Sequence, residues 1–253
     1  MNLRGTWTLF RKEVRRFMVV AMQTLLAPVI TALLYLVIFS HVMADRVTMY
    51  DDLAYSSFLV PGLIMMSIIQ NAFANSSSSL VFSKVTGSIV FVLLGPLTHL
   101  EFCLAFVAAA MVRALLVGLA IFVAASLYLE VQVAAPLYVL LFGFFGAATL
   151  ATTGFIVGIW ADKFDHAATF QNFVIMPLSF LSGVFYSIHS LPGVWQQISK
   201  FNPLFYMIDG FRYGFFGQSD VDPQIGIAVM CGALAMLGII SLTILRSGYK
   251  LRT

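Results

Sequence analysis

Charged residues are scarce in this sequence, and their scarcity decides its class. Only 10% of the 253 residues are Asp, Glu, Lys or Arg, whereas 60% are apolar. Soluble domains carry about 25% charged residues, so a soluble protein is excluded and a membrane protein is expected. Cysteine is also rare. Cys103 and Cys231 fall in apolar runs expected near opposite membrane faces, which favours two packed thiols over a disulfide.

Several catalytic motifs are missing as well. No Gly-Lys dipeptide occurs, so the chain lacks a phosphate-binding loop of the GxxxxGK type and is not expected to hydrolyse ATP by itself. Neither HExxH nor GxSxG is present. Asp162, Asp165 and His166 lie close together in one short loop, but no second cluster of metal ligands accompanies them. We therefore expect neither an enzyme nor a bound metal.

Long uncharged stretches dominate what is present, and each exceeds the roughly 20 residues that a bilayer crossing requires. They predict six membrane spans at about 22–42, 57–79, 100–128, 136–160, 169–187 and 224–245. The expected fold is an all-α polytopic membrane protein, with one transmembrane domain over 1–253. An even number of spans places both termini on one side.

Lys and Arg are distributed unequally between the two sides. If the N-terminus is cytoplasmic, three basic residues outside the spans lie on the outer side, namely Arg46, Lys200 and Arg212. Ten lie in cytoplasmic segments: Arg4, Arg11, Lys12, Arg15, Arg16, Lys84, Lys163, Arg246, Lys250 and Arg252. This bias predicts cytoplasmic termini. It also explains the net charge of +3 without nucleic-acid binding.

The segment before the first span, about 3–20, has helical periodicity. Its apolar stripe consists of Trp7, Phe10, Val14, Phe17 and Met18. Its remaining surface carries Arg11, Lys12, Arg15 and Arg16. These features predict an amphipathic interfacial helix on the inner leaflet, with cations near anionic lipid headgroups. A simple stop-transfer flank is the alternative.

The inner half of the second predicted span is unusually polar. Asn71 and Asn75 share one face of the second span with Ser78 or Ser79, which indicates either interhelical hydrogen bonds or a water-lined path. Arg113 is the one charge expected deep in the membrane, as a structural anchor or a substrate contact. Acidic residues lie in loops or at span ends, which disfavours an ion-coupled carrier.

Three further segments have distinctive patterns. Gly154 and Gly158 are four residues apart in the fourth span, a spacing that allows helices to approach closely. Loop 83–98 contains a short apolar helix-like run, which Gly95 and Pro96 end, and which either lies on lipid or docks into a partner. Region 188–217 is too broken for a span and too apolar for an ordinary loop, so a re-entrant pair of short helices is expected on the outer side.

Within that outer region, Asp209 and Arg212 stand three residues apart and are expected to neutralise each other partly. A structural anchor and a substrate contact are both open for this segment. The residues that we assign to the outer hairpin are Trp195, Asn202, Pro203, Asp209, Arg212 and Tyr213.

Together these features resemble the integral-membrane subunit of ABC-2 type transporters, a bacterial permease family that exports drugs, lipids or glycans. Four segments carry the resemblance: VRRF at the end of the N-terminal helix, QTLLAPVITALLYLVIF (23–39), FLVPGLIMMSIIQNAFAN (58–75) and PLSFLSGVFYSIHSLPGVWQQISKFNPLFYMIDGFRYG (177–214). The likeness covers nearly the whole chain, and its C-terminal motif is the most specific part.

The resemblance implies a permease in the bacterial inner membrane that pairs with a second copy of itself and with two copies of a separate ABC ATPase, which would bind ATP and Mg²⁺. The N-terminal helix and loop 83–98 would contact the ATPase, the latter as a coupling helix. Many relatives carry two glutamates in this loop, where this chain has Val90 and Phe91. The expected coupling residues are Lys84, Gly87, Ile89, Leu93, Leu94 and Pro96.

A candidate substrate path follows from the polar faces of three spans. It consists of Thr31, Tyr35, Asn71, Asn75, Ser179, Ser182 and Tyr186, a mixture of aromatic and amide groups that suits an amphipathic substrate. Two other function classes remain as alternatives: an ion-coupled secondary carrier and a membrane-embedded enzyme acting on lipid-linked substrates.

Overall fold

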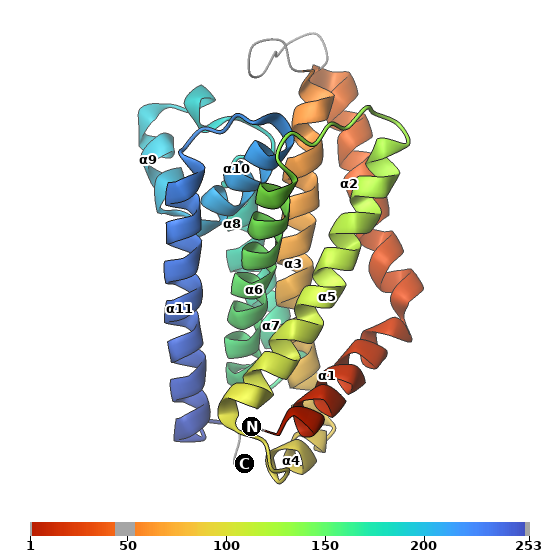
Figure 1. The fold of residues 1–253 in the computed structure, drawn as a ribbon, viewed down its shortest axis with the longest axis vertical. Coiled ribbons are helices and arrows are strands. Elements are labelled where there is room, and N and C mark those ends of the chain that lie inside the picture. Colours follow the sequence, from red (N-terminus) through yellow and green to blue (C-terminus); the bar gives the residue numbers. More distant parts are fainter. Residues whose placement is uncertain (1, 44–53, 251–253) are drawn as a thin grey trace.

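The computed structural model describes residues 2–43 and 54–250, and every regular element within these ranges is helical. The helices form an elongated bundle (Figure 1). The start of α1 (Leu3–Met18), the short α4 (Ser88–Leu93) and the end of α11 (Pro223–Ser247) lie at one end, which we call the cytoplasmic end after the orientation predicted from the sequence. The opposite end, with α9 (Gly193–Phe201) and α10 (Pro203–Phe216), is called the outer end. Arg46 and Arg252, which entered the orientation prediction, lie outside the described residues.

Five helices in the described ranges are long and apolar enough to cross a membrane, which confirms a polytopic membrane protein. They are α2 (Ala21–Met43), α3 (Tyr55–Val85), α5 (His99–Ser126), α6 (Pro136–Trp160) and α11. The central helix, α3, packs against α5, α6 and α10, and most of its side chains are buried. In contrast, α2 and α11 lie at the periphery and expose most of theirs.

Glycines set the distance between α3 and α6. A Cβ on Gly154 would lie 2.4 Å from the carbonyl oxygen of Phe73, and one on Gly158 would lie 2.9 Å from the Cβ of Leu80. Separations under 3.0 Å are too short for real Cβ atoms. The spacing of the two glycines therefore does place two backbones in close contact, as predicted.

The expected fifth span, 169–187, differs most from its prediction. Its helical part is divided into α7 (Phe164–Phe170), a π-helical turn (Gln171–Ile175) and α8 (Met176–Phe180), after which the chain leaves the helix. A proline clashes with the carbonyl four residues before it, and for Pro177 that residue, Phe173, lies in the π-helical turn, where the hydrogen-bond ladder is already displaced. At 1.5 Å per residue, 164–180 spans about 25 Å, slightly less than a hydrocarbon core of about 30 Å.

The remaining boundaries lie within about two residues of the expected ones, except that α3 continues to Val85, beyond the predicted end at 79. Short helices appear in the two regions where they were predicted. Region 188–217 contains a 3-10 turn (Ile188–Ser190) followed by α9 and α10. The C-terminus of α10 is capped by Gly217, whose φ of +68° is a left-handed conformation that glycine adopts without strain. Whether this pair of helices enters the outer leaflet stays a prediction.

The N-terminal helix α1 packs along α5 with a face that includes only part of the predicted stripe. Its buried residues are Leu9, Glu13 and Phe17, whereas Trp7 is 61% exposed. Trp7 stacks on Phe10 with ring centroids 5.3 Å apart. The helix therefore turns a mixed face, with one carboxylate, toward the bundle and leaves Trp7 accessible to lipid. Arg11 and Arg15 are exposed, as expected for cations near headgroups.

Candidate functional site

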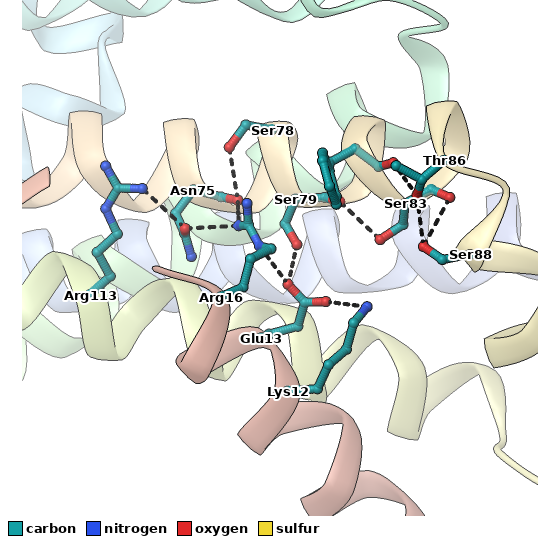
Figure 2. Close-up of polar contacts among 11 residues, drawn as sticks. Lys12, Glu13, Arg16, Asn75, Ser78, Ser79, Ser83, Thr86, Ser88 and Arg113 are labelled. Carbon is teal, nitrogen blue, oxygen red and sulfur yellow. Dashed lines mark hydrogen bonds and ion pairs between the residues drawn. The ribbon is translucent and has the colours of Figure 1, made fainter. Parts of the chain in front are cut away.

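A chain of polar side chains connects α1, α3 and α5 in the cytoplasmic half of the bundle (Figure 2). It begins at Glu13, whose side chain is 1% exposed. One carboxylate oxygen accepts hydrogen bonds from the hydroxyl of Ser79 and from Nε of Arg16, the latter over 3.1 Å. The other oxygen lies 2.9 Å from Nζ of Lys12. Glu13 thus holds two cations of α1 against α3.

The chain continues through an amide that two arginines share. Oδ1 of Asn75 accepts from Arg16 of α1 and from Arg113 of α5, over 3.1 Å in each case. Arg113 also donates to Oδ1 of Asn71 over 3.3 Å. Three helices therefore meet at two asparagines of α3, which we call, with Arg16 and Arg113, the arginine–amide cluster.

Two members of this network were missed by the sequence reading. Glu13 was counted among the acidic residues outside the spans, which is correct, but its burial was not expected. The available signal was its position on the same helix as Arg16, three residues earlier, which allows an ion pair. Ser79 belonged to the polar face of the second span, and nothing in the sequence pointed to its partner on α1.

At the cytoplasmic end, α4 exposes much of its apolar surface. Ile89 is buried, but Phe91 and Leu94 are each 79% exposed, and Leu93 is also exposed. Directly before the helix stands Gly87, whose φ of +70° turns the chain back after α3. Beside α4 lies an open cavity of about 450 Å³. Its lining comes from α4, the start of α5 and the end of α11: Val90, Val92, Leu93, Leu94, Leu97, Thr98, His99, Phe102, Leu245 and Gly248.

Lys84, an expected coupling residue, is engaged within the chain. Its Nζ donates to the carbonyl oxygens of Ile159 and Ala161, over 2.8 and 2.7 Å, and lies 3.4 Å from Asp162. A cation at the C-terminal end of α6 is favourable because the last carbonyls of a helix lack partners. Lys250 contacts the same Asp162 over 2.6 Å. The hydrogen bond from Lys250, together with the charges of both lysines, lowers the pKa of Asp162. The contacts of the two lysines join the ends of α3, α6 and α11.

The start of α1 is fixed to the segment that follows α4. The backbone N–H of Asn2 donates to Oε1 of Glu101, and its side-chain amide donates to the carbonyl of Pro96 over 3.3 Å. Glu101 also closes a capping box with Thr98 at the start of α5. Pro96 therefore lies where α1, α4 and α5 converge.

At the outer end, no ion-pair contact within 4.0 Å joins the charged groups of Asp209 and Arg212 in the described part of the chain. Asp209 instead accepts from the backbone N–H groups of Asp220 and Val221, over 2.9 and 3.0 Å. Arg212 donates to the carbonyl of Gly183 over 2.7 Å. Each side chain therefore has a hydrogen-bond partner elsewhere in the fold, and partial neutralisation of the two charges stays a prediction.

Those partners tie the outer helices to the bundle. The guanidinium of Arg212 lies 3.9 Å from the ring centroid of Phe58 on α3, a cation–π contact. Asn202 caps α10, which Pro203 begins, and donates to Ser182 over 2.9 Å and to Leu178. Of the other hairpin residues, Trp195 is half exposed and Tyr213 packs edge-on against Tyr138.

The seven candidate path residues do not lie together in the structure of the single chain. Asn71 and Asn75 belong to the arginine–amide cluster, and Thr31 is exposed on α2. Tyr35 packs edge-on against Phe185. Ser179 and Ser182 are buried and donate to carbonyls of their own segment, as does the half-buried Tyr186. A continuous path is therefore not formed by these residues within a single copy.

Comparison with known proteins agrees with this arrangement. The model of the family described as "ABC-2 type transporter" matches residues 4–216. The "Inner membrane transport permease YadH" of Escherichia coli K12 is 36% identical over 251 residues, covering 99% of this chain and 97% of the relative. "Nodulation protein J" of Rhizobium leguminosarum bv. viciae is 29% identical over 207 residues, covering 81% and 78%.

A third relative matches over a shorter region. The "Capsule polysaccharide export inner-membrane protein BexB" of Haemophilus influenzae is 32% identical over 108 residues, covering 41% of this chain and 40% of the relative. The extent of the family match and the near full-length similarity to a transport permease, together with five spanning helices, are decisive. This chain belongs to the ABC-2 type transporter family, as a multi-pass transport permease of the inner membrane.

Proposed function

We propose that this chain is the membrane subunit of an ATP-driven exporter, in which two copies of it work with two copies of a separate ABC ATPase. ATP and Mg²⁺ bind to the ATPase, and this chain forms the passage. The observation that carries the proposal is the short helix α4 at the cytoplasmic end: Phe91 within it and Leu94 directly after it are each 79% exposed. Exposed large apolar groups gathered on one element typically mark a binding surface for a partner.

The connections of α4 suit a coupling element. On one side, Ser88 contacts Thr86 over 3.0 Å and donates to the carbonyl of Ser83, so α4 is attached to the end of α3. On the other side, the chain runs through Pro96, which α1 contacts, into α5. A displacement of α4 by an ATPase would therefore act on three helices, the same three that meet at the arginine–amide cluster.

Pairing with a second copy of the chain is supported by polar side chains on α3 that are unfavourable in contact with lipid. Ser67, Gln70 and Ser78 lie on one face of α3 and are only partly buried. Polar side chains within spans usually face other protein or water. In the proposed pair these faces, with Thr31 of α2, border a passage for an amphipathic substrate. The printed name of one relative, a capsule polysaccharide export protein, supports outward transport.

The proposed topology has six crossings. The segment 164–187 makes the fifth, as a broken helix completed by non-helical residues at the outer end, and α9 with α10 forms a re-entrant hairpin. Both termini are then cytoplasmic. Ion-coupled transport has less support, because the one carboxylate buried in the described network, Glu13, is paired with Lys12 and Arg16 rather than free to exchange protons.

Co-expression with an ABC ATPase tests the proposal, and an ATPase gene adjacent to the gene for this chain would be the first choice. Native mass spectrometry of the purified complex is expected to give two copies of each subunit. In proteoliposomes the complex is expected to hydrolyse ATP at a rate that changes when substrate is added. A purified chain that transports under an ion gradient alone, and does not bind the ATPase, would contradict the proposal.

A further inference from the structure

The arginine–amide cluster carries more positive charge than its partners balance. Arg16 is paired with Glu13, but no carboxylate lies within 4.0 Å of Arg113 among the described residues. Both arginines donate to the single Oδ1 of Asn75, so two like charges are held beside one neutral acceptor. Two like charges that share one acceptor repel each other, and the repulsion is stronger where water is scarce.

One guanidinium also has unused hydrogen-bonding capacity. Nε of Arg113 is buried and has no hydrogen-bond partner among the described residues. The two donors that are used end on neutral amides, at 3.1 and 3.3 Å. Arg113 is partly exposed, and the side chain of Arg16 is 27% exposed. A negatively charged acceptor beside the two guanidinium groups would balance the excess positive charge.

The depth of the cluster indicates the source of such an acceptor. α3 has 31 residues, which at 1.5 Å per residue is about 46 Å and exceeds a hydrocarbon core of about 30 Å. Counting from Tyr55 at the outer end, Asn75 lies about 30 Å along the helix. With Tyr55 taken as the outer boundary of the hydrocarbon, the cluster is at the level where the hydrocarbon of the inner leaflet gives way to headgroups. Arg16 reaches that level from α1, the helix predicted to lie on the same leaflet.

We propose that Arg16, Asn75 and Arg113 bind the phosphate group of an anionic amphiphile that enters from the inner leaflet. Phosphate offers several charged oxygens, and the planar fork of a guanidinium matches it with two parallel hydrogen bonds. Two guanidinium groups from different helices then hold one headgroup between α1 and α5. This inference goes beyond the proposed function, since a bound headgroup requires neither the ATPase nor a second copy.

Lipid retention by the purified chain, without the ATPase, tests the site. Native mass spectrometry in micelles containing equal amounts of phosphatidylglycerol and phosphatidylcholine is expected to show about tenfold preference for phosphatidylglycerol, the ratio that one charge-assisted hydrogen bond provides. Arg113→Gln should abolish most of that preference. Arg113→Lys, which keeps the charge but loses the fork, should retain only part of it.

Arg15→Gln is the matched control, because Arg15 carries the same charge on the same helix but is exposed. It is expected to leave the preference nearly unchanged. Equal losses in Arg15→Gln and Arg113→Gln would reduce the effect to surface charge and overturn the proposal, as would the absence of any preference in the unchanged chain. Monodisperse elution and unaltered thermal stability in phosphatidylcholine alone verify that each variant is folded.

A soluble competitor separates a membrane lipid from a free phosphate. Inorganic pyrophosphate that displaces phosphatidylglycerol shows that the phosphate alone is recognised. Retention of phosphatidylglycerol at high pyrophosphate shows that the acyl chains are needed too, and assigns the site to a lipid. Both results support a phosphate site. Failure of both phosphatidylglycerol and pyrophosphate to bind would overturn it.

Discussion

Arg16 of α1 and Arg113 of α5 donate to the same atom, Oδ1 of Asn75, each over 3.1 Å. The helix predicted to lie on the membrane surface and a helix that can span the membrane are thus joined through one side chain of the central α3. Because Pro96, next to α4, also contacts the start of α1, the two ends of α1 connect the cytoplasmic surface to the interior of the bundle.

Asn75→Leu is expected to destabilise the protein more than any other single change in this cluster. Leu fills a similar volume but leaves both guanidinium groups without their common acceptor. An unsatisfied buried partner costs about 1–3 kcal/mol, and more when it is charged, which corresponds to a midpoint roughly 5 °C lower for a chain of this size. Thermal unfolding in detergent measures it. Asn71→Leu, which removes one longer bond, should have a smaller effect, and the reverse order would contradict this account.

Glu13→Gln should loosen α1 from α3. Glutamine can still accept from Ser79, but it no longer neutralises Lys12 and Arg16. Faster hydrogen–deuterium exchange is expected in α1, without a change in α6. The effect of Glu13→Gln should be much smaller in an Arg16→Gln background, because the pair is already broken there. Equal effects in both backgrounds would show that the ion pair does not hold the helix.

Gly154→Ala tests the contact between α3 and α6. The added methyl group would meet the backbone of Phe73 at 2.4 Å, so the helices must separate. Overpacking of this kind costs about 1–3 kcal/mol. Gly232→Ala on α11 is the control, since a Cβ there meets no atom within 4 Å and alanine favours the helix. Thermal unfolding should give a clear loss for the first variant and no loss for the second.

Asp209→Ala should loosen the segment before α11, and it should leave the contacts of Arg212 unchanged. The backbone amides of Asp220 and Val221 lose their acceptor, and hydrogen exchange at these two positions is expected to rise at least tenfold. Arg212→Gln is the comparison: it breaks the bond to Gly183 and should leave those amides protected. If Arg212→Gln exposed them equally, the two side chains would act as one pair, contrary to the geometry observed here.

The spans were predictable because twenty apolar residues in a row have few alternatives, and α6 begins and ends where its sequence suggested. The break in 169–187 was less visible, since Pro177 is tolerated in many membrane helices and the π-helical turn has no simple sequence signal. The short helices of 188–217 were predictable from Pro192, Gly193 and Pro203, because such residues interrupt a helix. Insertion of these helices into the outer leaflet is still untested.

The polar contacts were only half predictable. Asn71 and Asn75 were predictable from helical periodicity, which places them on one face of α3. Arg113 was predictable because it is the one charge within a long apolar run. The partners of Glu13 and Asp209 were not accessible in this way. Each lies on another element, and its position depends on how α1 crosses α3 and how the segment before α11 folds over α10. Short spacing suggested an Asp209–Arg212 pair, but the hydrogen-bond partners of both side chains lie elsewhere in the fold.

The central claim is that an ATPase drives this permease through α4, and the rate of ATP hydrolysis by the reconstituted complex tests it most directly. Leu94→Asp introduces a charge on the exposed apolar surface directly after α4, whereas Leu94→Met keeps that surface apolar. We predict that Leu94→Asp abolishes the effect of the permease on the ATPase, while its fold and thermal stability stay those of the unchanged chain, and that Leu94→Met behaves normally. Full coupling in Leu94→Asp would contradict the account.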